Sequence, residues 1–104
     1  MPNPNYIKGR NFEYAVMRHL RTVGYDAMRT AGSHGQFDIV AIHKSQGCIE
    51  FIQCKVVETS GEAERLKKAF RKDPPYAPFV LPRNVHQALF VKVSGSSKWE
   101  EIYV

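Results

Sequence analysis

Hydrophobic residues first recur at helical spacing, between about Tyr6 and Val23. One stripe of this segment holds Phe12, Val16, Leu20 and Val23. Polar residues occupy the other side, which is the pattern of an amphipathic helix packed against a core. Gly24 follows the last apolar position and is predicted to end the helix.

The pattern then changes to the short, β-branched runs that are typical of strands. Strands are predicted at residues 25–29, 37–43 and 48–57, with a loop at 30–36 and a turn at 44–47. In the third run, alternation places one set of side chains on one face: Ile49, Phe51, Gln53 and Lys55. Gln53 and Lys55 are therefore predicted to point the same way.

A second amphipathic helix is predicted at residues 62–71. Its expected buried side holds Ala63, Leu66, Ala69 and Phe70, and its expected exposed side holds Arg65, Lys67, Lys68 and Lys72. Asp73-Pro-Pro ends the helix, a proline-rich connection runs through 74–82, and strands are predicted at 87–93 and 99–104. The order of helix, three strands, helix and two strands predicts an α/β fold, with a sheet flanked by helices.

Composition limits the kinds of protein that the chain represents. Its 104 residues, 43% of them hydrophobic, predict a single domain over 1–104. The formal net charge of +5 favours a polyanionic partner such as nucleic acid.

No apolar run approaches the ~18 residues of a membrane span and the N-terminus lacks the regions of a signal peptide, so we expect a cytoplasmic protein without membrane contact. Cys48 and Cys54 fit neither a zinc site nor a disulfide framework, and we expect reduced thiols.

A few polar residues stand out against this apolar pattern. Asp38 opens a predicted strand, and Gln53 and Lys55 lie within another, where unpaired polar groups are costly to bury. Glu13 borders the buried stripe of the first helix. Each has a structural interpretation, as a solvated helix glutamate, a loop cap or an exposed strand end. If they converge at one sheet edge, they can surround a divalent cation, which is what phosphodiester hydrolysis needs.

Other chemistries lack their motifs. The four histidines, His19, His34, His43 and His86, have no zinc-ligand spacing. The chain also contains neither a Gly-x-x-x-x-Gly-Lys phosphate loop nor a Gly-x-Ser-x-Gly nucleophile turn.

Taken in order, the candidate residues resemble the PD-(D/E)xK nuclease superfamily and, within it, the archaeal-type Holliday junction resolvases. The resemblance rests on a series of short motifs in the first 57 residues: Lys8-Gly9, Glu13, Gly24-Tyr25, Arg29-Thr-Ala-Gly-Ser33, Asp38-Ile-Val-Ala and Gln53-Cys-Lys55. It implies a restriction-endonuclease-like mixed β-sheet. It also implies a structure-selective endonuclease that hydrolyses phosphodiesters in four-way DNA junctions.

The resemblance further implies roles for individual residues. Mg²⁺, or Mn²⁺ in its place, would be held by Asp38, the side-chain oxygen of Gln53, a backbone carbonyl near Cys54, and Glu13 directly or through water. Lys55 would orient or activate the attacking water. Arg29 and Ser33 would position the phosphate, and further basic residues would track the DNA backbone: Lys8, Arg10, Lys67, Lys68 and Arg71. A junction must be cut on two strands, so a twofold homodimer is expected.

Two positions depart from the family pattern. Gln53 stands where the family usually has a carboxylate, and Tyr14 stands where a basic residue usually follows the helix glutamate. These departures keep two alternatives open. One is a restriction-like or repair endonuclease acting on duplex DNA, and the other is a non-catalytic DNA-binding module derived from a nuclease.

Overall fold

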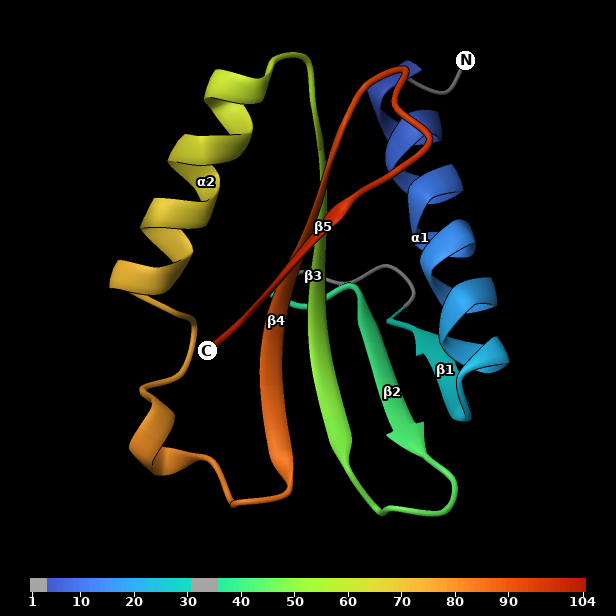
Figure 1. Cartoon of the computed structure of the whole chain (residues 1–104), viewed down its shortest axis with the longest axis vertical. Helices are drawn as coiled ribbons and strands as arrows, with labels where there is room; N and C mark the ends of the chain where they lie inside the picture. The colour runs from blue at the N-terminus through green and yellow to red at the C-terminus, as the bar shows by residue number, and fades with distance from the viewer. Residues whose placement is uncertain (1–3, 31–35) are drawn as a thin grey trace.

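The computed structural model describes residues 4–30 and 36–104. Its elements are, in chain order, α1 (Pro4–Thr22), β1 (Tyr25–Arg29), β2 (Ile39–His43), β3 (Ile49–Val57), α2 (Ser60–Lys72), the short 3₁₀ helix η1 (Pro78–Val80), β4 (Val85–Val93) and β5 (Glu100–Tyr103). The strands form one sheet between the two long helices (Figure 1). The predicted fold class and element order are confirmed, with strand and helix ends within a few residues of their expected positions.

The sheet is mixed, as the family resemblance implied. Its strands lie in the order β1-β2-β3-β4-β5, and all neighbours are antiparallel except β3 and β4, which are parallel. Parallel neighbours need a long crossover, and α2 supplies it. The pairing of β2 with β3 sets Ile39 opposite Ile52, which brings the start of β2 beside the middle of β3.

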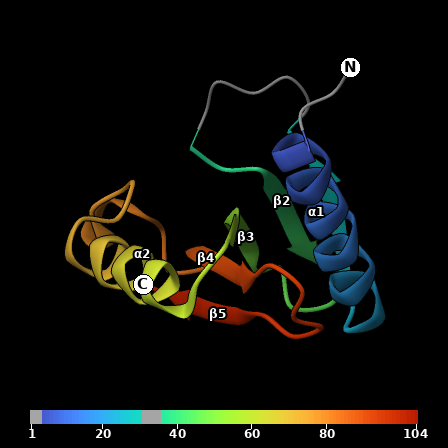
Figure 2. The ribbon, with the colours of Figure 1, turned by 90° about the horizontal axis from the view of Figure 1, so that it is seen from above.

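The two faces of the sheet carry separate cores because side chains alternate along β4. Ala88 and Phe90 pack in a cluster with Phe12, Val16, Met17 and Leu20 of α1. Leu89 and Val91 point the other way and pack with Ala63 and Phe70 of α2. Figure 2 shows the consequence: α1 and α2 lie apart, with strands between them.

The end of α1 differs from the predicted stripe at one position. Val23 was expected to be buried, but the helix ends at Thr22 and Val23 is 49% exposed, while Met17 is buried in its stead. Gly24 adopts a φ of +99°, which favours glycine, and a Cβ there would lie 2.8 Å from Nε2 of His43. The chain therefore turns before Val23 can reach the core.

The buried side of α2 also differs from prediction. Thr59 caps the helix by accepting a hydrogen bond from the Glu62 amide at 3.2 Å. Lys67, expected to be exposed, has a side chain only 7% exposed, whereas Ala69 is exposed. The Lys67 ammonium lies 2.6 Å from Glu100 of β5 and 2.5 Å from Glu64. A lysine is accommodated there because two carboxylates neutralise it where α2 packs against the sheet.

Two further sequence predictions concern cysteines and membranes. Cys48 and Cys54 are both free thiols, as expected. In the part of the chain that the structure describes, neither helix is long and apolar enough to cross a membrane.

Candidate active site

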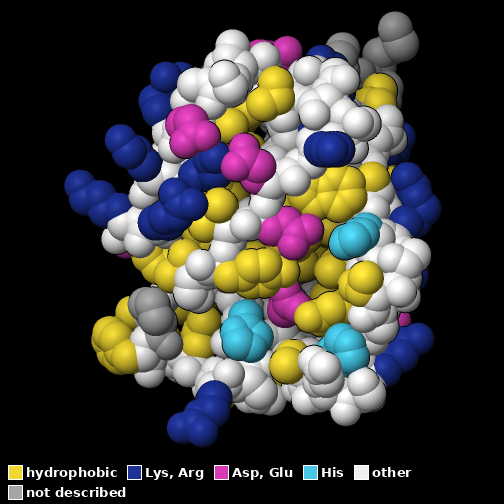
Figure 3. All heavy atoms as spheres, viewed as in Figure 1, with side chains coloured by type: hydrophobic (Ala, Val, Ile, Leu, Met, Phe, Trp, Pro, Cys, Tyr) yellow, Lys and Arg dark blue, Asp and Glu magenta, His cyan; other side chains and the backbone are white. Residues whose placement is uncertain are grey.

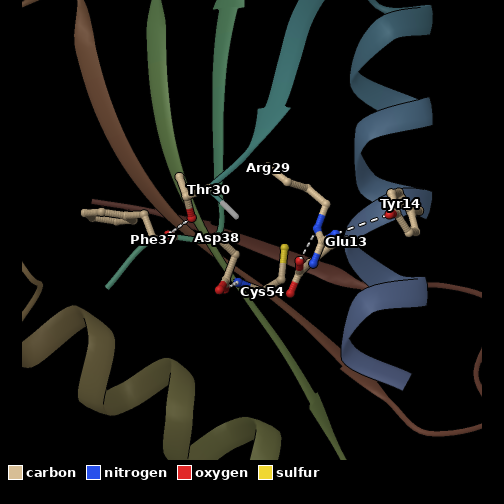
Figure 4. Close-up of polar contacts among 7 residues, drawn as sticks. All are labelled: Glu13, Tyr14, Arg29, Thr30, Phe37, Asp38 and Cys54. Carbon is tan, nitrogen blue, oxygen red and sulfur yellow. Dashed lines mark hydrogen bonds and ion pairs between the residues drawn. The ribbon is translucent and has the colours of Figure 1, made fainter. Parts of the chain in front are cut away.

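Asp38 lies directly before β2, where backbone contacts fix it against β3. Its amide donates to the carbonyl of Ile52 at 2.8 Å, and its Oδ2 accepts from the Cys54 amide at 2.8 Å (Figure 4). Thr30 closes the base of the preceding loop, since its amide donates to the Asp38 carbonyl at 2.9 Å. The Asp38 carboxylate is thereby held beside the stretch of β3 that carries Gln53.

Glu13 projects from α1 and forms an ion pair with Arg29 at the end of β1. Nε of Arg29 donates to Oε1 of Glu13 at 2.9 Å, and these side chains are 26% and 16% exposed, respectively. Nη1 of Arg29 donates to the Tyr14 hydroxyl at 3.2 Å, and the guanidinium lies over the Tyr14 ring, 5.0 Å from its centroid. The hydrogen bond to Glu13 is the main factor that raises the pKa of Arg29. The guanidinium is therefore a fixed positive charge beside Glu13.

Cys54 connects the two acidic residues. Figure 4 shows its sulfur between the Asp38 and Glu13 side chains. Burial raises the pKa of the Cys54 thiol, and the charges of Asp38 and Glu13 raise it further. The thiol is accordingly neutral, and both carboxylates lie close enough for their charges to raise its pKa. The structure thus places Glu13 of α1, paired with Arg29 of β1, and Asp38 on either side of Cys54.

Gln53 and Lys55 lie on the other face of β3, and the prediction that they share a face is confirmed. Gln53 lines a cavity of about 360 Å³ together with Leu66 and Phe70 of α2, while Lys55 is exposed. Asp38 is the residue that links the two groups, because it bonds to the backbone on both sides of Gln53. Within residues 4–30 and 36–104, no three His, Cys, Asp or Glu side chains gather as metal ligands, so a cation here depends on the amide or backbone oxygens as well.

The remaining predicted DNA contacts have varied surroundings. Lys8 lies 3.5 Å from Glu58 and donates to Ser94 Oγ at 3.2 Å. Arg10 places its guanidinium 5.7 Å from the Tyr6 ring centroid. Ser33 and its loop lie outside the described residues.

On α2, the structure separates predicted contacts that the sequence had grouped. Lys68 and Arg71 are exposed, and Figure 3 shows Lys and Arg side chains gathered over α2. The prediction that Lys67 is exposed is wrong, because its side chain is only 7% exposed and its ammonium pairs with Glu64 and Glu100, so we expect no DNA contact from it. Ala63, Lys67 and Phe70 lie on one side of α2 at helical spacing, which is the pattern of buried positions. Because lysine is charged, the sequence prediction assigned it to the exposed side.

Lys67 and Lys68 provide a matched test of this correction. We expect Lys68→Gln to weaken junction binding and to lower the slope of log K against log salt by about 1, the value for one lost phosphate contact. Lys67→Gln should instead lower Tm, because Glu100 loses its partner, with little change in the salt slope. Fluorescence anisotropy at several salt concentrations and thermal unfolding measure both effects, and a larger salt effect for Lys67→Gln would contradict the assignment.

Tyr14 supports Arg29, a contact that the sequence did not predict. The sequence marked Tyr14 only as a departure from the family pattern. In the structure its ring and hydroxyl hold the guanidinium that pairs with Glu13. No local signal predicts this contact, since it joins residues 15 positions apart through the packing of α1 on β1.

The fold and the residues on it define a class of protein. A mixed sheet in which an aspartate at the start of one strand lies beside a Gln-x-Lys segment of the next, with a helix glutamate near, is that of a PD-(D/E)xK-type nuclease. The model of the archaeal Holliday junction resolvase (hjc) family matches residues 4–68, more than half of the chain, and the chain belongs to this family. It is therefore a structure-selective endonuclease of four-way junctions.

A solved structure agrees with this fold. The chain is similar to Hjc from Archaeoglobus fulgidus, a Holliday junction resolvase from an archaeal hyperthermophile, with 24% sequence identity, a TM-score of 0.56, and coverage of 91% of this chain and 71% of that chain. It is also similar to the SPO1766 protein of unknown function from Silicibacter pomeroyi, with 18% identity, a TM-score of 0.40, and coverage of 97% and 70%. Among curated proteins, no significant match was found.

Proposed function

We propose that the protein resolves Holliday junctions by metal-dependent hydrolysis, with Mg²⁺ as the cation and Mn²⁺ as a substitute. The observation that carries this proposal is the meeting of Glu13 and Asp38, from separate elements, on either side of Cys54. Hard cations prefer oxygen ligands, and the recorded hydrogen bonds involve one oxygen of each carboxylate, Oε1 of Glu13 and Oδ2 of Asp38. These carboxylate oxygens are therefore ligands of the type that magnesium prefers.

The ligands would be Asp38, the side-chain oxygen of Gln53 and a backbone carbonyl near Cys54. Glu13 lies on the opposite face of β3 from the Gln53 side chain and would act on the cation through water. When bound, the cation polarises the phosphate and makes water a better nucleophile. The rest of the reaction depends on the side chains of the chain itself. Lys55, exposed on the Gln53 face of β3, would orient the attacking water and stabilise charge that develops on the phosphate.

Arg29 would position the phosphate. Its recorded hydrogen bonds use Nε and Nη1, for Glu13 and Tyr14 respectively. Within the described residues this leaves Nη2 for a phosphate oxygen, at an orientation that Glu13 and Tyr14 fix. Arginine suits this task because its planar group offers several donors in a rigid arrangement.

Metal dependence is tested on the purified protein with a labelled four-way junction. We expect cleavage with Mg²⁺ or Mn²⁺ and none with EDTA. The chief alternative is a non-catalytic junction-binding module, which Gln53 and the pairing of Glu13 with Arg29 favour. Tight junction binding without cleavage under either metal would support that alternative.

A cytoplasmic location and a role in DNA recombination and repair remain predictions that follow from the same proposal.

The neutral charge of Gln53 leads to a prediction on metal affinity. Gln53→Glu adds a carboxylate to the site and should lower the Mg²⁺ concentration for half-maximal cleavage by about tenfold, since an added charge near a divalent cation is worth on the order of 1 kcal/mol after repulsion from Glu13 and Asp38. Gln53→Ala should raise that concentration. Magnesium titration of the cleavage rate measures both.

The matched control is Gln46→Glu, which makes the same chemical change in the exposed turn between β2 and β3. It should leave the magnesium dependence unaltered. An unchanged magnesium dependence in both Gln53 variants would show that Gln53 is no ligand.

A second prediction concerns assembly. Resolution requires two symmetric cuts, and each chain of this size offers one candidate site, so we propose a twofold homodimer. Analytical ultracentrifugation at micromolar protein should report about twice the monomer mass, free or bound to a junction. A strict monomer in both conditions would favour an endonuclease that makes single cuts on duplex DNA.

A further inference from the structure

A hollow lined by positively charged side chains lies on the flank of α1 away from Glu13. It is a hollow of about 390 Å³ between α1 and the ends of β3 and β4. Its polar lining consists of Lys8, Asn11, Arg18, Lys92 and Ser94, and Phe12 and Val56 lie among its apolar walls. The candidate active site shares no residue with this lining.

The charge of the hollow is strongly one-sided. Lys8, Arg18 and Lys92 contribute three positive charges, and no aspartate or glutamate belongs to the lining. Glu58 lies 3.5 Å from Lys8, but their side chains are 63% and 46% exposed, so water screens this pair. The hollow therefore keeps an excess of positive charge.

Neutral hydrogen-bond donors complete the lining. The Ser94 hydroxyl accepts from the Lys8 ammonium at 3.2 Å, so its own proton is free to point to another acceptor. Asn11 adds an amide. Three cations with hydroxyl and amide donors around one hollow suit a group that carries several acceptor oxygens and negative charge, as a phosphate does.

The position of the hollow separates it from the chemistry. Successive residues of an α-helix are rotated by about 100°, so Glu13 lies about 200° around α1 from Asn11. Asn11, Ala15 and Arg18, at spacings of four and three, share the flank that faces the hollow. A helix with its side chains is about 10 Å wide, so a phosphate in the hollow and a phosphate beside Glu13 are different groups.

We propose that this hollow binds a second phosphate of the junction DNA, on the other side of α1 from the scissile phosphate. The proposal rests on the proposed function for the identity of the polyanion. With one phosphate held on each flank, α1 would be set across the DNA backbone and the scissile group would be aligned with Asp38. The contact carries no base information, so the binding it supports is independent of sequence.

The test compares two double variants that remove the same charge. The double variant Arg18→Gln with Lys92→Gln removes two of the three positively charged side chains that line the hollow. Lys44→Gln with Lys98→Gln removes two exposed lysines elsewhere and serves as the control. Junction affinity is measured in EDTA over a range of salt concentrations, so the result does not depend on cleavage. Thermal unfolding verifies that both proteins are folded.

We expect the hollow variant to lose about tenfold in junction affinity at 0.1 M salt and about 1 in the salt slope, which is the effect of one lost phosphate contact. The control should change both quantities much less. Equal effects in the two variants would overturn the proposal, because only net charge would then matter. A specific loss in a protein that never cleaves would retain the hollow while refuting the proposed catalysis.

A second measurement identifies the source of the phosphate. Backbone amide signals of Ser94 and Gly95 in NMR spectra of the wild type should shift on addition of a short DNA duplex, and inorganic phosphate should shift the same signals only at far higher concentration. The hollow variant should show neither response. Tight binding of AMP at these amides, with junction affinity equal in both double variants, would assign the hollow to a free nucleotide and overturn the DNA proposal.

Discussion

Asp38→Asn is expected to reduce junction cleavage by about 1000-fold or more, with junction affinity nearly unchanged. The substitution keeps an oxygen that accepts from the Cys54 amide, so the start of β2 should keep its place. What it removes is a negative charge from the proposed cation site. A bound metal ion contributes several kcal/mol to the stabilisation of the transition state, and about 4 kcal/mol corresponds to 1000-fold in rate.

Affinity should remain because it arises from many phosphate contacts rather than from this acid. Single-turnover cleavage and gel-shift assays on one preparation measure the two quantities. Asp26→Asn, an exposed aspartate of β1, is the matched control and should cleave like the wild type. If Asp38→Asn cleaves at a near wild-type rate, Asp38 has no part in holding the cation.

Arg29→Ala is expected to lower the single-turnover rate by about 100-fold even at saturating protein. It deletes the donors proposed for the phosphate and also leaves the largely buried Glu13 without its partner. A scissile phosphate that is misplaced by about 1 Å can lower the rate of the chemical step by about 100-fold. Tyr14→Phe should give a smaller loss, because the ring still lies beneath the guanidinium while the hydroxyl contact is gone.

The control for Arg29 is Arg83→Ala, which removes an exposed arginine before β4. It should affect salt-dependent binding at most. The ¹⁵N–¹H signal of Arg29 Nε gives a readout that is independent of activity, because its exchange with water should be slow in the wild type and faster in Glu13→Gln. Unaltered cleavage by Arg29→Ala would limit the role of Arg29 to its ion pair with Glu13.

The sequence predicted the fold well because local patterns determine most of its elements. Gly24 marks the end of α1, and the alternation in β3 placed Gln53 and Lys55 on one face correctly. The errors occurred where tertiary contacts outweigh residue type. Lys67 is buried because Glu64 and Glu100 form ion pairs with it, and Glu100 of β5 lies 33 residues away in the sequence.

The sequence named the candidate residues of the site but not the contacts that they make. The order of Glu13, Asp38 and Gln53-Cys-Lys55 indicated convergence, but the register that places Asp38 beside Cys54 exists only in the paired strands. The Arg29 ion pair with Glu13 likewise depends on how α1 packs on β1. Such contacts cannot be derived from periodicity, which reports which side of an element a residue occupies and not what it meets.

We expect this domain to cut four-way junctions by paired incisions, and a cleavage competition measures this most directly. A junction and a linear duplex of the same arm sequence, each labelled on a different strand, are incubated together with the protein and Mg²⁺. We expect the junction to be cut far faster, with incisions placed symmetrically on two opposing strands and nicked duplexes as products. Equal cleavage of the linear duplex, or no cleavage of either DNA alongside tight junction binding, would contradict the account.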